Sequence, residues 1–466
     1  MKSIKSLMQR TFFALVAMVI AVALGLPLIN LMVGLPKDIR LGAQTGASDT
    51  YVAAAQALGQ KCGNCHSAQG KLPFYAALPF ASSLVKDDIR KGTEWFDLVA
   101  SFANTPAQPI GEATLAKIEK TIQDGAMPPH RYRALHWNGT LSAAQQQAVL
   151  SWIQQVRATY YASPASPDAL KTAVIQPIPQ PPQLDLKKVA LGKLLYHDTR
   201  LSKDNSLSCA SCHDLAKGGT DQAAVSSGVG GAKGGINAPT VFNAAYHLAQ
   251  FWDGRAADLA AQAAGPPGNP IEMASSWPEI VTKLTQDAAF KADFEESYPD
   301  GISQQAVCDA IATFEKTLLT PNCDFDKFLL GDQSALSDSA KLGYTLFLKS
   351  GCATCHSGIA MGGRSFEKMG RHADYFTDRG NPTAADEGRA SVTKNDSDKH
   401  KFKVPTLRNI ALTAPYFHDA SAKSLAEAVR QMGHYQTGTT FTEQETVQLV
   451  SFLESLTGEF EGKKLR

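Results

Sequence analysis

The chain has 466 residues, with 45 Lys and Arg against 44 Asp and Glu, and a formal net charge of +1. This length allows about three domains. The balanced charge provides no basic field of the kind that binds a nucleic acid backbone, so we expect no nucleic acid partner.

The N-terminus combines three positive residues, Lys2, Lys5 and Arg10, with an uncharged run from 11 to 36. The run is longer than the apolar core of a secretory signal, and no clear small-x-small cleavage site follows it. We therefore predict an uncleaved transmembrane helix within residues 1–37. The positive residues place the short end in the cytoplasm. The rest of the chain would then lie in the periplasm of a bacterium, anchored in the inner membrane by a single pass.

The pentapeptide C-x-x-C-H occurs three times, at 62–66, 209–213 and 352–356. It is the attachment signal for a c-type haem, in which two thiols bind the porphyrin and the imidazole binds iron. A single copy could be a redox dithiol or half of a zinc site, but three copies without a nearby second C-x-x-C disfavour both. We predict three covalent haems. The attachment residues are Cys62, Cys65, Cys209, Cys212, Cys352 and Cys355, and the iron ligands are His66, His213 and His356.

The first haem motif lies in a predicted domain over 46–162. A short helix over 51–60 leads into the motif, and a capping box, Ser142 to Gln145, starts a helix that closes the domain. We expect the sixth iron ligand in the loop between them and choose Met127, because prolines follow it and a thioether suits an electron-transfer iron. His130 and His136 are weaker alternatives, and Met127 could instead be a packing residue.

Six prolines between 163 and 182 predict a linker over 163–183. Two further haem domains are expected beyond it, over 184–331 and 332–466, because Leu191-Gly192 and Leu342-Gly343 begin the same L-G-x-x-L-aromatic pattern before the second and third motifs. No sustained alternation of apolar and polar residues indicates strands. The fold class expected is mainly α, with three cytochrome c-like domains in tandem after the transmembrane helix.

Two cysteines, Cys308 and Cys323, remain outside the haem motifs. A helix predicted over 304–320 would separate them by on the order of 20 Å, at about 1.5 Å per residue. A disulfide needs a much shorter distance between Cα atoms. Both are therefore expected to be free, buried thiols.

Polar side chains follow the second motif in segments broken by Gly and Pro. They include Asn237, Trp252 in the sequence Gln-Phe-Trp-Asp-Gly-Arg, Gln262 and Glu272. An electron carrier needs only two iron ligands and an apolar jacket. An acid and an amide in a loop instead indicate a place where a proton is moved beside an open haem face. Glu272 as a helix cap and Trp252 as core packing are the alternatives.

From Cys209 to Glu272, with Cys352 to His356, Ala411 to His418 and Met432-Gly433, the chain resembles the bacterial dihaem cytochrome c peroxidases. The resemblance covers roughly 187–458. With the added N-terminal haem domain and membrane helix, the whole chain resembles the trihaem members of that family. Those are membrane-bound peroxidases that can take electrons from quinol.

The resemblance implies a role for each matching residue around the two later haems. The haem at Cys209 and Cys212 would reduce hydrogen peroxide, with Glu272 as acid and base and Gln262 positioning the peroxide. The haem at Cys352 and Cys355 would transfer electrons with Met432 as its distal ligand, for which His434 is an alternative.

The resemblance also implies features between these haems. Trp252 would lie between them, and Asn237, Thr413 and Pro415 would match a calcium site built mostly from backbone carbonyls and water. The electron donor would be membrane quinol or a soluble cytochrome c. A homodimer is possible by the same analogy.

One segment departs from the family pattern. Many relatives carry a distal His in the Gly-rich segment after the peroxidatic motif, and here that position is Val229, with no His between His213 and His247. Since valine cannot bind iron, and Lys233 and His247 would need a rearranged loop, we predict a second haem whose ferric state is already open to peroxide.

Two other functions fit parts of the sequence. A pure electron-transfer cytochrome would need a sixth ligand for the second haem, and none is evident. A dihaem enzyme that matures a cofactor in a partner protein would carry Tyr as the distal ligand of the later haem, where this chain has Met432.

Overall fold

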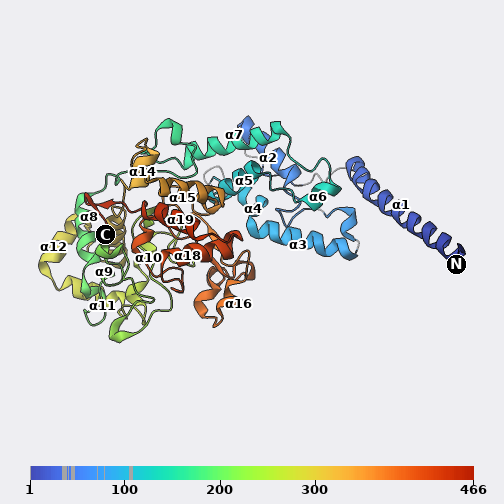
Figure 1. Ribbon diagram of the computed structural model, residues 1–466. Helices are drawn as coiled ribbons and strands as arrows, with labels where there is room; N and C mark the ends of the chain where they lie inside the picture. Colours follow the sequence, from blue (N-terminus) through green and yellow to red (C-terminus); the bar gives the residue numbers. More distant parts are fainter. Residues whose placement is uncertain are drawn as a thin grey trace. The chain divides into compact units, whose positions relative to one another are not determined.

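The computed structural model describes residues 2–33, 39, 41–42, 48–70, 72–77, 79–103 and 109–466. The chain divides into two units, Met1–Tyr160 and Tyr161–Arg466 (Figure 1). Helices dominate each of them, as predicted. The predicted boundaries at residues 37 and 46 lie outside the described residues.

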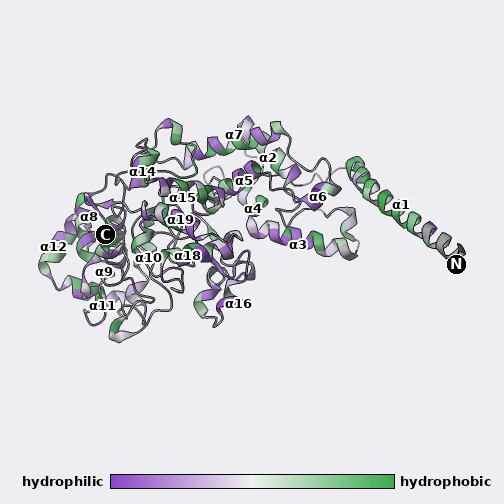
Figure 2. Ribbon diagram, viewed as in Figure 1, coloured by the Kyte–Doolittle hydropathy of each residue, from purple (hydrophilic) through white to green (hydrophobic). Residues whose placement is uncertain are grey.

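The first unit begins with a long helix, α1 (Lys2–Val33), that is hydrophobic over most of its length (Figure 2). Within the described residues, Arg10–Val33 is the one helical stretch long and apolar enough to cross a membrane, a property that anchors share with signal sequences. The other helices of this unit are α2 (Asp49–Lys61), α3 (Pro79–Trp95), α4 (Leu98–Phe102), α5 (Glu112–Asp124), α6 (His130–Leu135) and α7 (Ala143–Tyr160).

The core of the first unit is formed where α2, α4 and α7 meet. The rings of Tyr51, Phe102 and Trp152, one from each helix, pack with centroids 5.4 to 6.3 Å apart. The predicted capping box starts α7, because Ser142 N donates to Gln145 Oε1 and Gln145 N donates to Ser142 Oγ. The helix that delivers the first haem motif therefore packs against the helix that closes the domain.

The second unit contains short helices and two small antiparallel sheets. The sheets pair β1 (Phe366–Lys368) with β2 (Lys401–Lys403) and β3 (Glu459–Phe460) with β4 (Lys463–Lys464). The helices are α8 (Leu186–Tyr196), α9 (Cys209–Cys212), α10 (Leu259–Ala263), α11 (Trp277–Thr285), α12 (Ala288–Ser297), α13 (Gln304–Glu315), α14 (Asp324–Leu329), α15 (Asp338–Lys349), α16 (Tyr375–Arg379), α17 (Ala390–Thr393), α18 (Leu425–Met432) and α19 (Glu443–Glu454).

Two helix crossings organise this unit, and each is made at a glycine. A Cβ atom on Gly192 of α8 would lie 2.0 Å from the carbonyl oxygen of Ala310 on α13. A Cβ atom on Gly343 of α15 would lie 1.9 Å from the carbonyl oxygen of Gln448 on α19. The repeated Leu-Gly pattern therefore marks the same close helix contact twice. A capping box at Thr442 and Glu445 begins α19.

The segment 163–183 packs into the second unit in addition to connecting the two. Ile175, Gln176 and Ile178 are buried. Gln176 N donates to Gly358 O at 3.4 Å, and Arg408 Nη2 donates to Gln176 O at 2.7 Å. The prolines predict a stiff segment, but only tertiary contacts show that its apolar residues join the core.

Cys308 and Cys323 are buried, and neither forms a disulfide, as expected. Cys308 lies on α13, which ends at Glu315 instead of continuing to 320. Cys323 caps α14 by accepting a hydrogen bond from Asp326 N.

We predict that Gly192→Ala and Gly343→Ala each lower the free energy of unfolding by about 1–3 kcal/mol, because the added methyl group meets a backbone carbonyl that cannot move alone. Thermal unfolding followed by circular dichroism would measure this. Gly235→Ala is the control, since its Cβ would meet no atom within 4 Å. Equal melting temperatures for all three variants would contradict the prediction.

Candidate active site

Each of the three motif histidines is held by a backbone carbonyl. The Nδ1 atoms of His66, His213 and His356 lie 3.4, 3.4 and 3.1 Å from the carbonyl oxygens of Phe96, Gly219 and Met361. Because a carbonyl oxygen only accepts, Nδ1 carries the proton and Nε2 keeps the lone pair that a metal needs. These residues therefore fit a c-type haem at each motif.

Burial keeps two of these imidazoles neutral. It lowers the pKa of His213, and it lowers the pKa of His356 to about 4, although nearby backbone carbonyls act in the opposite direction. A neutral imidazole is the form that ligates iron. Both side chains are therefore ready to bind metal at neutral pH.

The helix before the second motif is tied directly to it. The hydroxyl of Tyr196, at the end of α8, donates to the His213 carbonyl oxygen at 2.5 Å. Burial raises the pKa of Tyr196 well above its ordinary value, so the hydroxyl stays protonated and remains a donor. The glycine crossing of α8 thereby also positions the motif.

Glu272 faces a cavity of about 490 Å³. The cavity is lined by Phe251, Arg255, Ala256, Ala257, Ala261, Gly265, Pro266, Asn269 and Glu272. Asn269 Nδ2 donates to Glu272 Oε1 at 2.7 Å, and Asn269 Oδ1 accepts from Ile271 N at 3.2 Å. The Asn269 amide is thus fixed by its own loop and binds Oε1 of the Glu272 carboxylate. It makes no hydrogen bond to Oε2.

The Gly-rich loop that contains Val229 packs on the Glu272 segment. Val229 N donates to Glu272 O at 2.8 Å, and a Cβ on Gly228 would lie 2.1 Å from Ile271 O. Glycine is required here because the two backbones approach too closely for a side chain. Val229 therefore stands beside the candidate acid and base.

Gln262 lies on α10 with Ala261, but it is not among the residues that line the cavity. Two other residues that sequence reasoning missed do line it. One is Asn269, and the only feature of the sequence that could have indicated it is its position three residues before Glu272. The other is Arg255, whose guanidinium lies 3.5 Å from the centre of the Phe251 ring.

Trp252 contacts both of the predicted haem domains of the second unit. Its indole Nε1 donates to Asn237 O at 2.8 Å, and Asn237 N donates to His418 O at 2.9 Å. Its ring meets the rings of Phe402 and His418 edge-on, both at 6.4 Å between centroids. A continuous path of hydrogen bonds and ring contacts therefore passes through Trp252.

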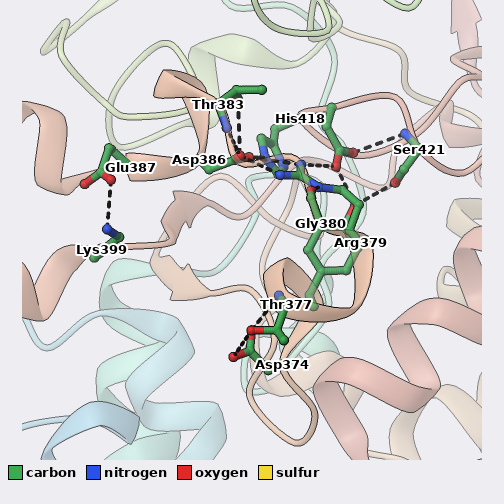
Figure 3. A network of polar contacts seen from close by, with 12 residues as sticks. Asp374, Thr377, Arg379, Gly380, Thr383, Asp386, Glu387, Lys399, His418 and Ser421 are labelled. Carbon is green, nitrogen blue, oxygen red and sulfur yellow. Dashed lines mark hydrogen bonds and ion pairs between the residues drawn. The ribbon is translucent and has the colours of Figure 1, made fainter.

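A buried network of charges holds the His418 end of this path (Figure 3). Arg379 contacts Asp386 at 2.5 Å and Asp419 at 2.7 Å, and His418 Nε2 donates to Asp386 Oδ1 at 2.8 Å. The Tyr375 hydroxyl donates to Asp419 Oδ2 at 2.6 Å. Nothing in the local sequence predicted this network, because its members come from α16, the turn at Asp386 and the loop of His418 and Asp419.

Charge pairing controls the ionisation of Asp386. Burial acts to raise its pKa, but hydrogen bonds from Arg379 and His418 outweigh burial and hold that pKa well below its usual range. The carboxylate therefore stays ionised through the whole physiological range.

The residues expected at a calcium site lie on segments that meet. Asn237 is bonded to His418 in the loop that begins at Thr413 and Pro415, and Asn237 Nδ2 donates to Ala223 O at 2.8 Å. That donation leaves Asn237 Oδ1 as the atom that a cation would use. Within the described residues no group of three His, Cys, Asp or Glu side chains is placed to hold a metal, so backbone carbonyls would supply the other ligands.

The two candidate methionine ligands have different surroundings. Met432 ends α18 and packs against the apolar cluster that contains Trp252, whereas its alternative His434 is exposed. Met127 is 51% exposed in the loop between α5 and α6. His136 is buried, and its Nε2 contacts the Tyr75 hydroxyl at 3.0 Å.

The three C-x-x-C-H motifs, each with its histidine anchored by a backbone carbonyl, define a c-type haem protein. Residues 186–334 match the family described as di-haem cytochrome c peroxidase, residues 40–155 match a haem-binding domain, and residues 340–457 match cytochrome c.

Individual relatives agree with these matches. The cytochrome c peroxidase Ccp of Escherichia coli (strain K12) is 50% identical over 399 residues, which are 85% of this chain and 85% of that protein. The cytochrome c551 peroxidase of Nitrosomonas europaea is 47% identical over 287 residues, 61% of this chain and 84% of the relative. The crystal structure of a MauG-like protein associated with microbial copper homeostasis is similar with a TM-score of 0.54 at 30% identity, covering 60% of this chain and 94% of that one.

The chain therefore belongs to the di-haem cytochrome c peroxidase family. It is a haem peroxidase, an oxidoreductase that acts on hydrogen peroxide, and it binds haem c. The predicted mainly helical fold with a C-terminal cytochrome c domain is confirmed.

We predict that Asp386→Asn lowers the free energy of unfolding at pH 7 by about 1.5–3 kcal/mol, because it removes the buried carboxylate charge that pairs with half-buried Arg379, which still contacts Asp419. The folded-state pKa of Asp386 is depressed, so its stabilisation is present above the ordinary carboxyl pKa of about 3.9 and is lost as pH falls through the folded value. The difference between the variant and the wild type should therefore shrink in acid.

Urea unfolding at a series of pH values would test this. Glu387→Gln is the matched control, since Glu387 pairs with Lys399 at 2.9 Å on the surface. Such an exposed pair is screened by solvent and adds little to stability. A constant difference between Asp386→Asn and wild type down to the acid limit would contradict the assignment.

Proposed function

We propose that the protein is a membrane-anchored trihaem peroxidase that reduces hydrogen peroxide to water in the periplasm. Glu272 in its cavity carries this proposal, because it is a carboxylate oriented by Asn269 and placed beside the loop of Val229. The haem at Cys209, Cys212 and His213 would be the peroxidatic one.

When bound, haem c supplies an iron that accepts an oxygen ligand and exchanges electrons. The overall reaction joins one peroxide with two electrons and two protons to give two waters. Glu272 would take the proton from one peroxide oxygen and deliver it to the other, which leaves as water. Asn269 keeps the carboxylate in one orientation, and Gln262 on α10 would position the peroxide by hydrogen bonding without titrating.

Electrons would reach this site from the haem at Cys352, Cys355 and His356, with Met432 as its distal ligand. Trp252 would lie between the two haems, and its hydrogen bond to Asn237 supports that role. Calcium at Asn237, Thr413 and Pro415 would stiffen the same junction. Methionine ligation raises the potential of a haem, so that it can hold an electron in reserve.

The first unit would supply electrons to the second. Its haem would be held by Cys62, Cys65 and His66, with Met127 as the sixth ligand. The apolar helix α1 supports an anchor and therefore membrane quinol as donor, with a soluble cytochrome c as the alternative. Domains over 46–162, 184–331 and 332–466, and a homodimer, complete the proposal.

We expect Glu272→Gln to reduce peroxide turnover by about 10²–10⁴-fold, the usual contribution of a general acid and base. Steady-state peroxide consumption, with quinol analogue and reduced cytochrome c compared as donors, would measure it. The haem spectra should be unchanged. Glu279→Gln is the control, because Glu279 pairs with Lys283 on the surface of α11. Activity within about threefold of wild type would assign the proton transfer to another group.

We expect the fully oxidised wild-type protein to bind cyanide and react with peroxide without a lag, because Val229 offers no ligand to iron. Val229→His should close the second haem in a low-spin state and impose a lag that pre-reduction removes. Stopped-flow absorbance would follow both proteins. A strict requirement of the wild type for pre-reduction would overturn this interpretation.

A further inference from the structure

Lys403 and His247 form a buried polar pair near the third haem motif. Lys403 is 5% exposed on β2, and its Nζ donates to Ala249 O at 3.0 Å and lies 3.3 Å from His247 Nδ1. An ammonium group only donates, so His247 Nδ1 accepts and the ring proton is on Nε2.

This arrangement leaves hydrogen-bond donors without acceptors. His247 Nε2 is buried and has no partner among the described residues. An ammonium group has three donors, and the described contacts of Lys403 Nζ use two of them. Ser365 Oγ, two residues beyond the glycine that packs on the His247 ring, is also buried without a partner.

The pair has a positive charge, and no negatively charged group among the described residues contacts it. The two atoms in contact with Lys403 Nζ are a carbonyl oxygen and an imidazole nitrogen. Burial lowers the pKa of Lys403 to about 8, and Asp253, which acts to raise that pKa, is itself paired with Arg255 at 2.9 Å. Burying an uncompensated charge costs several kcal/mol, so buried charges in proteins are normally paired.

The position of the pair connects it to the third motif. A Cβ on Gly363 would lie 2.1 Å from His247 Cδ2, and Gly363 N donates to Val404 O at 2.7 Å. Gly363 lies two residues after Met361, whose carbonyl holds His356 Nδ1. Lys403 N also donates to Trp252 O at 2.7 Å. Arg364 adds a further positive charge, with its Nη1 bonded to Tyr246 O.

We propose that Lys403 and His247, assisted by Ser365, form the binding site for a propionate carboxylate of the haem attached to Cys352 and Cys355. The inference rests on the proposed third haem. A carboxylate accepts from the free Nζ donor and from Nε2–H, and its negative charge compensates the ammonium. Lys403 is then a positioning residue that also sets the haem's redox equilibrium, because it neutralises an anion that would otherwise stabilise ferric iron.

The test is a redox titration of full-length holoprotein with Lys403→Gln. The haem concerned is identified as the one whose potential changes in Met432→His. We expect the equilibrium constant for its reduction to fall about tenfold, which is 59 mV for a one-electron couple. Lys403→Arg should retain most of the wild-type value. Lys401→Gln is the matched control, since Lys401 lies on the same strand but pairs with Asp398 at 3.0 Å.

His247→Phe provides an independent arm, because it keeps a ring against Gly363 and removes the Nε2 donor. It should lower the same equilibrium constant for haem reduction, and it tests the site even if the Lys403→Gln protein does not fold in sufficient yield. Wild-type potentials in both variants, with the full haem content, would overturn the site. A haemochrome count below three in the wild type would instead count against the proposed function.

Discussion

The two glycine crossings, Gly192 on Ala310 and Gly343 on Gln448, are the constraint on which the second unit depends. At each one, two helix backbones approach so closely that a methyl group would overlap a carbonyl oxygen. The crossing sets where each entry helix ends. The third motif begins three residues after α15, and the second motif, further from the end of α8, is tied to it by the hydrogen bond from Tyr196 to the His213 carbonyl. The haem-binding histidine is thus positioned by helix packing first and by its carbonyl hydrogen bond second.

The residues proposed for proton transfer and electron transfer lie in loops that follow the entry helices of these crossings in the sequence. Glu272, Asn269 and Val229 meet because Gly228 allows two backbones to touch. Trp252 donates a hydrogen bond to the Asn237 carbonyl and packs its ring against the rings of Phe402 and His418. Rigid helices therefore fix the cofactor motifs, while hydrogen-bonded loops bring the proton-transfer and electron-transfer residues between them.

Buried charge is treated in two different ways in this unit. Arg379 pairs with both Asp386 and Asp419, and His418 Nε2 donates to Asp386, so each of these charges has a partner within the protein and together they fix the His418 loop. Lys403 has no such partner among its contacts, and its neighbour His247 keeps an unsatisfied nitrogen. Since both groups are costly to bury alone, the first network is complete without a ligand, and the second is arranged to receive an anion.

The sequence by itself determined the features that depend on short spacing. The C-x-x-C-H motifs, the two capping boxes, the repeated Leu-Gly pattern and the helical class all follow from residues within a few positions of one another. Glu272 could also be singled out, as a lone acid in a segment broken by Gly and Pro.

Only the tertiary structure decided which distant residues meet. Asn269 and Arg255 line the Glu272 cavity while Gln262 does not, and residues 163–183 bury apolar side chains in a core. The His418 network and the Lys403–His247 pair each join segments that are separated by many residues in the sequence. Their members are ordinary polar residues in sequence, because charge pairing and burial depend on distance in space, which no local pattern specifies.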